Sequence, residues 1–116
     1  MPLFKITNHD QLHSIREKPF KLEKDIQSLT EVNLKAIYGL SFVRSEFSLN
    51  NFRVDTLAYD HDAGTFVIIE YKRDKNFSVI DQGYAYLSLM LNNKADFILE
   101  FNENSNETLK RQDVDW

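Results

Sequence analysis

The sequence predicts an α/β domain whose elements follow in the order helix, three strands, helix, strand. Two segments, 22–38 and 78–92, carry apolar residues at the three- and four-residue spacing of helices. Short apolar runs rich in β-branched and aromatic residues lie between these segments and after them. Because a helix separates the third strand from the fourth, we expect a mixed central sheet flanked by helices.

The composition fits one globular domain. The chain has 116 residues, of which 42% are hydrophobic and 13% aromatic, enough for one modest core rich in aromatic rings. It contains no cysteine, which excludes disulfides, zinc–thiolate sites and thiol catalysis. Its net charge of -4 means that a nucleic-acid partner would need a local basic patch or a bound cation. Neither a membrane span nor a signal peptide is recognisable, so we expect a cytoplasmic protein that does not enter membranes.

The first helix is predicted over residues 22–38, because Leu22, Ile26 and Leu29 recur at helical spacing and Gly39 follows as a C-terminal cap. The second helix, over about 78–92, begins with residues at capping-box spacing and is apolar almost all round, so it should be buried. Upstream of both helices, residues 3–6 predict a short strand, and a short helix is expected around Leu12 and Ile15.

Four strands are predicted, over residues 41–49, 52–59, 65–72 and 95–101. The pair Asn50-Asn51 forms a turn between the first two, because asparagine tolerates positive φ. The third strand is apolar without alternation, which is typical of a central strand covered on both faces.

Three charged residues lie at the ends of these apolar strands. Glu70 and Lys72 are two apart, so they share a face, and a hairpin between the second and third strands would bring Asp55 beside Glu70. Two close carboxylates repel unless a proton or cation lies between them, and oxygen ligands suit Mg²⁺ or Mn²⁺. A neighbouring lysine can orient a water molecule, so the group suits metal-assisted hydrolysis of a phosphodiester. Arg53 has the strand parity of Asp55 and could contact phosphate or lower the pKa of Asp55.

This pattern resembles the PD-(D/E)XK, or restriction-endonuclease-like, nuclease superfamily through Val54-Asp55 followed by Glu70-Tyr71-Lys72. Val54 replaces the leading proline of the motif. The chain is also similar to an uncharacterised bacterial family with Arg-x-Asp-Thr-Leu and Ile-Ile-Glu-Tyr-Lys motifs. The resemblance implies a single nuclease-like domain over residues 1–116, with a core over about 20–101. In that family the domain continues further, which implies that this chain is truncated or minimal at its C-terminus.

The resemblance extends to both helices. It matches Glu31 to an acidic residue of the first helix, and it matches Gln82 and Tyr86 to a Gln-x-x-x-Tyr motif. It implies that Asp55, Glu70 and the Tyr71 backbone carbonyl bind Mg²⁺ or Mn²⁺, with Glu31 completing the shell. Lys72 would position the attacking water, and Gln82 and Tyr86 would orient the site or the substrate backbone. The implied partner is a nucleic acid, DNA before RNA, and a homodimer is compatible with the pattern.

Simpler interpretations remain open for each of these residues. Glu70 and Lys72 could form a strand-end ion pair, and Glu31 could be an ordinary exposed helix residue. Gln82 could contact exposed backbone amides at a helix N-terminus, and Tyr86 could be a core aromatic residue. The fold could also carry a non-catalytic module that binds nucleic acid or protein, or an oligomerisation domain.

Overall fold

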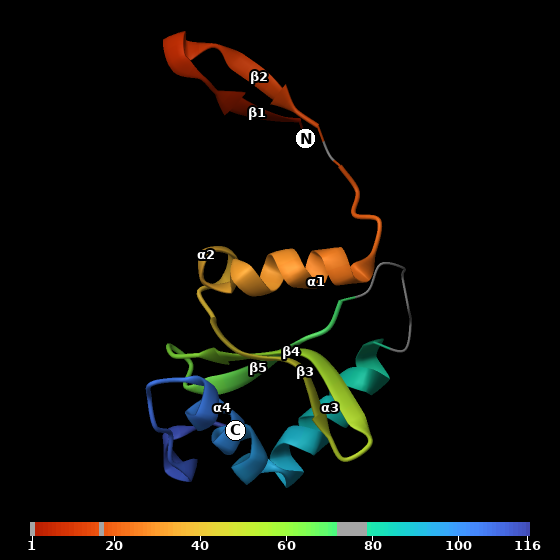
Figure 1. The fold of residues 1–116 in the computed structure, drawn as a ribbon, viewed down its shortest axis with the longest axis vertical. Coiled ribbons are helices and arrows are strands. Elements are labelled where there is room, and N and C mark those ends of the chain that lie inside the picture. Colours follow the sequence, from red (N-terminus) through yellow and green to blue (C-terminus); the bar gives the residue numbers. More distant parts are fainter. Residues whose placement is uncertain (1, 17, 72–78) are drawn as a thin grey trace.

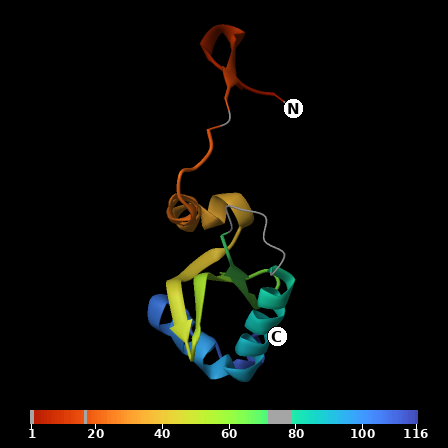
Figure 2. The ribbon, with the colours of Figure 1, turned by 90° about the vertical axis from the view of Figure 1, so that its right-hand side faces the viewer.

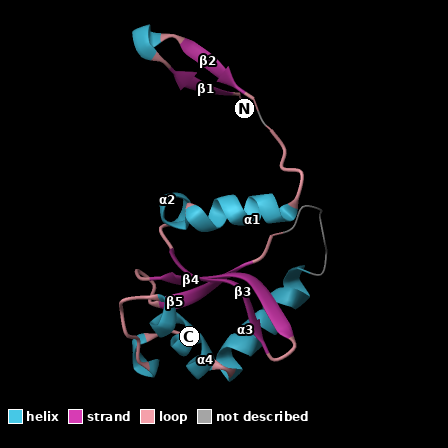
Figure 3. Ribbon diagram, viewed as in Figure 1, coloured by secondary structure: helices cyan, strands magenta, loops and turns pink. Residues whose placement is uncertain are grey.

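The computed structural model of the protein describes residues 2–16, 18–71 and 79–116 and is a mixed α/β structure (Figures 1 and 3). Four helices and two antiparallel sheets make up the described chain. None of the described helices is long and apolar enough to cross a membrane. In chain order the elements are β1 Leu3–Ile6, η1 Asn8–Asp10, β2 Leu12–Ile15, α1 Glu23–Val32, α2 Leu34–Tyr38, β3 Ser41–Leu49, β4 Phe52–Asp60, β5 Thr65–Ile69, α3 Val79–Asn92, α4 Lys94–Asn104 and η2 Arg111–Asp113.

The larger sheet separates two layers of helices. Its strands lie in the order β3-β4-β5, and both neighbouring pairs are antiparallel. Figure 1 shows α1 and α2 on one side of this sheet and α3 and α4 on the other. The register of β4 with β5 runs from Asp60 opposite Thr65 to Thr56 opposite Ile69. The strands β3 and β4 are predicted correctly to within one residue at each end, and β5 begins where predicted.

The main core lies between the sheet and the second layer of helices, and it is aromatic as predicted. Phe97 of α4 lies edge-on to Phe47 at 5.3 Å and to Phe66 at 5.7 Å between ring centroids. Phe101 packs on Tyr59 at 4.9 Å. A smaller cluster on the other face joins helix α2 to the sheet and contains Leu34, Leu40 and Ala58.

The fourth strand predicted over residues 95–101 is wrong, because this segment lies within helix α4. Phe97 and Phe101 are four residues apart, so a helix brings both rings to one face, where they are 0% and 2% exposed. A strand would also place them on one face, and the alternation therefore fitted both conformations. The described sheet is accordingly antiparallel rather than mixed, and β4 rather than β5 is its central strand.

Two predictions near the N-terminus also need correction. The short helix expected around Leu12 and Ile15 is strand β2, which pairs with β1. The single helix expected over residues 22–38 is divided at Asn33, whose φ of -122° and ψ of 17° interrupt the helical backbone. Gly39 does cap α2 as predicted, with φ of 69° and its N–H bonded to carbonyls of the last turn.

The β1–β2 hairpin stands away from the rest of the molecule (Figures 1 and 2). All eight strand residues are exposed, including Leu3, Phe4, Ile6 and Leu12. We call residues 2–16 the arm and residues 23–71 with 79–116 the body. The candidate site lies entirely in the body.

Candidate functional site

Asp55 lies in the centre of β4 and faces the end of β5. Its Oδ2 accepts a hydrogen bond from the backbone N–H of Tyr71 at 3.2 Å. The paired register of β4 with β5 ends with Thr56 opposite Ile69, and Asp55 and Glu70 are the next residues on the two sides. The hydrogen bond from Tyr71 therefore ties the Asp55 side chain to the segment that follows β5.

Tyr86 of α3 joins the Glu70 carboxylate to β4. Its hydroxyl lies 3.0 Å from Glu70 Oε1 and 3.1 Å from the carbonyl oxygen of Arg53. The side chain is 8% exposed, so this polar atom sits in a largely dry setting where hydrogen bonds are strong. Tyr86 is thus both a core aromatic residue and a partner of the predicted centre. Arg53 contributes its backbone carbonyl here, and its side chain belongs to an exposed residue.

The opposite face of the same strands carries a chain of hydrogen bonds that ends at Glu31. Thr56 Oγ1 donates to Glu31 Oε2 at 2.6 Å and lies 2.9 Å from the Tyr71 hydroxyl. A threonine hydroxyl has one proton, and a carboxylate can only accept it. The Tyr71 hydroxyl must then be the donor to Thr56. The proton direction therefore runs from Tyr71 through Thr56 to Glu31.

Gln27, four residues before Glu31 on α1, closes this network. Its Nε2 lies 3.0 Å from the Asp55 carbonyl oxygen, 3.2 Å from Ser45 Oγ and 3.3 Å from Glu31 Oε2. An amide nitrogen has two protons, so it can serve two of these three acceptors well at one time. The shortest contact fixes α1 on the backbone of β4 at the residue that carries the Asp55 carboxylate.

The Tyr71 hydroxyl is shielded from water and surrounded by negative charge. Burial raises the pKa of Tyr71 above 10.0, and the carboxylates of Glu31 and Asp55 raise it further, whereas the hydrogen bond with Thr56 lowers it. Tyr71 therefore keeps its proton at neutral pH, in agreement with its role as a donor.

The predicted acidic residues are divided between the two faces of the sheet. Glu31 meets β4 on the face of α1, while Glu70 meets Tyr86 of α3 on the other. Within the described ranges, no group of three or more His, Asp or Glu side chains is placed to hold a metal ion. Asp55 is therefore bonded to Tyr71 and Glu70 to Tyr86, while Glu31 belongs to the network on the face of α1.

Two further residues were predicted at the site, Lys72 and Gln82. Lys72 lies outside the described residues, so its predicted role stays a prediction. Gln82 is a residue of helix α3, and its side chain lies outside the described part of the structure. The role predicted for the Tyr71 carbonyl likewise stays a prediction.

The sequence reading overlooked Gln27, Ser45 and Thr56. Gln27 could have been found from its four-residue spacing to Glu31, which places both on one face of α1. Thr56 is a fully buried polar residue beside Asp55. Threonine is common in strands, so nothing in the sequence distinguishes it from an ordinary strand residue.

A second polar cluster lies at the far end of the sheet, around His61. Its Nδ1 lies 3.1 Å from Ser41 Oγ, and its Nε2 lies 2.8 Å from Glu107 Oε2. The side chains of His61 and Glu107 are 44% and 59% exposed. This cluster attaches the segment after α4 to the β4–β5 turn, and no part of it joins the Asp55–Glu70 pair.

Comparison with known proteins leaves the family of the chain open. No protein-family profile matches the sequence, and no solved structure matches it. An uncharacterized protein from Haemophilus influenzae (strain ATCC 51907 / DSM 11121 / KW20 / Rd) is 58% identical over 106 residues. The match covers 91% of this chain and 35% of that protein, so the chain spans about a third of the relative's length.

Proposed function

We propose that this chain is a metal-dependent nuclease domain of restriction-endonuclease-like type, which hydrolyses phosphodiester bonds in DNA, with RNA as the second substrate class. One observation carries the proposal. Asp55 accepts from the Tyr71 N–H, Glu70 lies 3.0 Å from the Tyr86 hydroxyl, and these two carboxylates are the next residues after the last pair of the β4–β5 hairpin. Carboxylates in such a position are costly to bury unless a cation or proton compensates them.

The chemistry of the donor set supports Mg²⁺ or Mn²⁺. Asp55 and Glu70 offer carboxylate oxygens, and the Tyr71 carbonyl follows directly after Glu70 in the chain. Hard divalent cations prefer oxygen ligands and bind through one or two carboxylates plus water and substrate oxygens. A bound ion would polarise the scissile phosphate and lower the pKa of a coordinated water molecule.

The protein's own residues have distinct parts in this proposal. Tyr71 and Tyr86 orient the two carboxylates through the backbone N–H and the hydroxyl described above. Glu31 acts through Thr56 and Gln27, which fix the backbone of β4 beside Asp55. By resemblance, Lys72 positions the attacking water and Gln82 orients the substrate backbone.

The test compares nuclease activity of the wild-type chain with that of single-residue variants. Fluorescently labelled DNA and RNA, both single- and double-stranded, are incubated with the protein in Mg²⁺, in Mn²⁺ or in a chelator. We expect metal-dependent cleavage, and we expect Asp55→Asn, Glu70→Gln and Lys72→Ala each to lower the rate on the order of a hundredfold or more.

A matched control removes one carboxylate elsewhere. Asp62→Asn alters an exposed aspartate in the β4–β5 turn and should cleave at the wild-type rate. Equal activity in the wild type and in Lys72→Ala would contradict the mechanism. Loss of activity in Asp62→Asn as well would indicate a general effect of charge rather than a centre at Asp55 and Glu70.

A second candidate is a non-catalytic module that binds nucleic acid or protein on the same type of fold. The net charge of -4 and the position of Glu31 away from the Glu70–Tyr86 contact favour it. Binding of labelled nucleic acid without cleavage in either metal, unchanged in Glu70→Gln, would support this function over the nuclease.

A further inference from the structure

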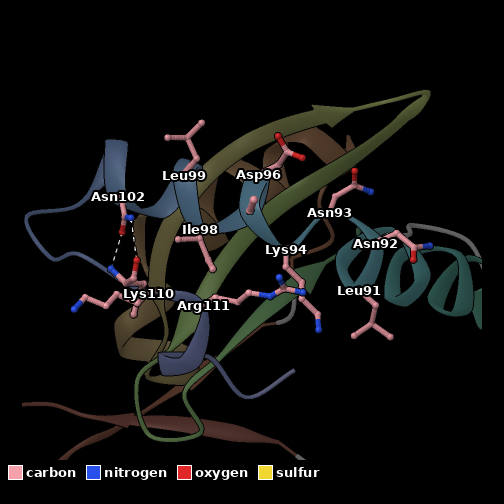
Figure 4. A pocket seen from close by; sticks show the side chains of 12 residues that line it. Leu91, Asn92, Asn93, Lys94, Asp96, Ile98, Leu99, Asn102, Lys110 and Arg111 are labelled. Carbon is pink, nitrogen blue, oxygen red and sulfur yellow. Dashed lines mark hydrogen bonds between the residues drawn. The ribbon is translucent and has the colours of Figure 1, made fainter.

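A cavity of about 550 Å³ opens where α3, α4 and the segment around η2 meet (Figure 4). Its walls come from the end of α3, from α4 between Lys94 and Asn102, and from residues 109–111. Small-molecule sites usually measure about 300–1,000 Å³. None of the residues described above around Asp55 and Glu70 lines this cavity. It is therefore separate from the proposed catalytic centre.

Two cationic side chains converge at this cavity. Figure 4 shows Lys94, from the start of α4, and Arg111, from η2, reaching toward one another, while Lys110 and Asp96 point away. Among the described residues, neither Lys94 nor Arg111 forms an ion pair with a carboxylate. Like charges that converge in this way repel until an anion lies between them. In a chain of net negative charge, this local excess of positive charge is a distinct feature.

The Lys94 side chain and the backbone that carries Arg111 are both fixed by contacts within the chain. The Lys94 ammonium lies 5.6 Å from the centre of the Trp116 ring, a cation–π contact. Arg111 begins η2, a turn closed by the hydrogen bond from the Lys110 N–H to Asp113 Oδ2 at 2.9 Å. Side chains on fixed backbone lose less entropy on binding, so such a pair suits recognition of an anion.

The wall also contains apolar side chains that are fixed by packing, beside several polar residues. Ile98 and Leu109 line the cavity and pack against the main core. Asn102 accepts from the Leu109 N–H at 2.8 Å and donates to its carbonyl at 3.2 Å, as the dashed lines in Figure 4 show. A ligand for this cavity would therefore combine an anionic group with an apolar or aromatic body.

We propose that this cavity binds a phosphorylated small molecule of mononucleotide size. The phosphate lies between Lys94 and Arg111, and the organic body lies on Ile98 and Leu109. A guanidinium donates two parallel hydrogen bonds to phosphate, and an ammonium adds a compact positive charge, so this pair favours phosphate over uncharged groups. The same phosphate chemistry occurs at the end of a polynucleotide, and the test separates these two sources.

The test is a calorimetric titration of the full chain with adenosine 5′-monophosphate, adenosine, inorganic phosphate and a 5′-phosphorylated ten-nucleotide DNA. We expect the monophosphate to bind more tightly than inorganic phosphate, adenosine to bind at least about tenfold more weakly, and the oligonucleotide to gain nothing further. Equal binding of adenosine and the monophosphate would overturn the proposal. Tighter binding of the oligonucleotide would also overturn it and assign the phosphate to a polynucleotide end.

Single substitutions locate the site. Lys94→Gln and Arg111→Gln should each weaken monophosphate binding about tenfold or more, whereas Lys35→Gln, which removes an exposed charge on α2 outside the cavity, should leave it within about twofold. Lys94→Arg should retain most of the affinity, which separates loss of charge from loss of folding. Equal weakening by Lys35→Gln would reduce the effect to general electrostatic attraction and overturn the proposed site.

Discussion

Thr56 has no exposed surface, yet its hydroxyl connects two elements of the fold. It donates to Glu31 of α1 and accepts from the hydroxyl of Tyr71, which follows β5. A buried hydrogen bond to a charged group is stronger than one between neutral groups, and an unsatisfied partner is costly. The residue therefore controls how firmly α1 is held on the sheet.

The first prediction is that Thr56→Val destabilises the protein by about 2 kcal/mol. Valine fills nearly the same volume, so the loss comes from the Tyr71 donor and the Glu31 acceptor that lose their partner. Urea unfolding followed by circular dichroism measures the change. Thr56→Ser keeps the hydroxyl and should lose less; if both variants lost the same free energy, packing of the methyl group rather than the hydrogen bonds would be responsible.

The second prediction concerns alkaline pH. Burial and the neighbouring carboxylates raise the pKa of Tyr71, and burial together with Asp113 and Glu107 raises that of Tyr59. The folded state thus binds these protons more tightly than the unfolded state. The stabilisation is fully present below about pH 10 and is lost as the pH rises through the folded pKa values.

Denaturant unfolding between pH 8 and 11.5 measures this dependence, with tyrosinate absorbance as the direct titration. Tyr71→Phe should flatten part of the decline, whereas Tyr84→Phe, at a residue 68% exposed, should leave the curve unchanged. A decline that is identical in the wild type and in Tyr71→Phe would show that the Tyr71 proton is not linked to folding.

At the scale of elements, the strands next to the site were predictable because several signals agreed. Strand β4 is flanked by an asparagine turn and a glycine turn, with Asn50 at φ of 55° and Gly64 at φ of 67°, and its interior is apolar. Helix α4 was not predictable in this way. Its apolar residues alternate as in a strand, and Phe97 and Phe101 also follow the four-residue spacing of a helix. Which conformation forms depends on packing of Phe97 against Phe47 and Phe66, which are distant in sequence.

The candidate site also has parts that could be predicted from the sequence and parts that could not. The β4–β5 hairpin was predictable because hairpin register is local, and Tyr86 was matched through the Gln-x-x-x-Tyr motif of the family resemblance. The division of Glu31 from Glu70 across the sheet was not predictable. It depends on which face of the sheet α1 covers, and that is fixed by tertiary packing through Gln27 and Leu34 rather than by periodicity.

The third prediction concerns the β1–β2 hairpin. It has two short strands, every strand residue is exposed, and a two-stranded hairpin without a covering layer is marginally stable in water. Its amide protons should therefore exchange with solvent far faster than those of β4, by roughly a thousandfold or more. Hydrogen exchange followed by mass spectrometry measures both segments in one sample. Comparable protection of β1 and β4 would mean that the hairpin is covered in solution.

At the scale of the whole molecule, charge is unevenly distributed. Residues 1–22 contain four Lys or Arg and two Asp or Glu. Residues 23–116 contain ten Lys or Arg and sixteen Asp or Glu. The N-terminal part therefore carries a net charge of +2, and the rest carries -6. Opposite net charges attract at low salt over about 10 Å or more, so they favour contact between residues 1–22, which include the arm, and an acidic surface.

The last prediction tests whether the arm stands off in solution. The Cα radius of gyration is 17.5 Å and the longest axis is 54 Å, whereas a compact domain of this length measures about 13 Å. The excess comes from the arm, which lies at one end of the long axis (Figure 2). Small-angle X-ray scattering should give about 17–18 Å for the full chain and about 12–13 Å after removal of residues 1–20. If the full chain measured about 13 Å at low salt and expanded at high salt, the basic arm would be folded back on its own acidic body. A radius well above 18 Å that falls on dilution would instead show that the arm reaches a second molecule.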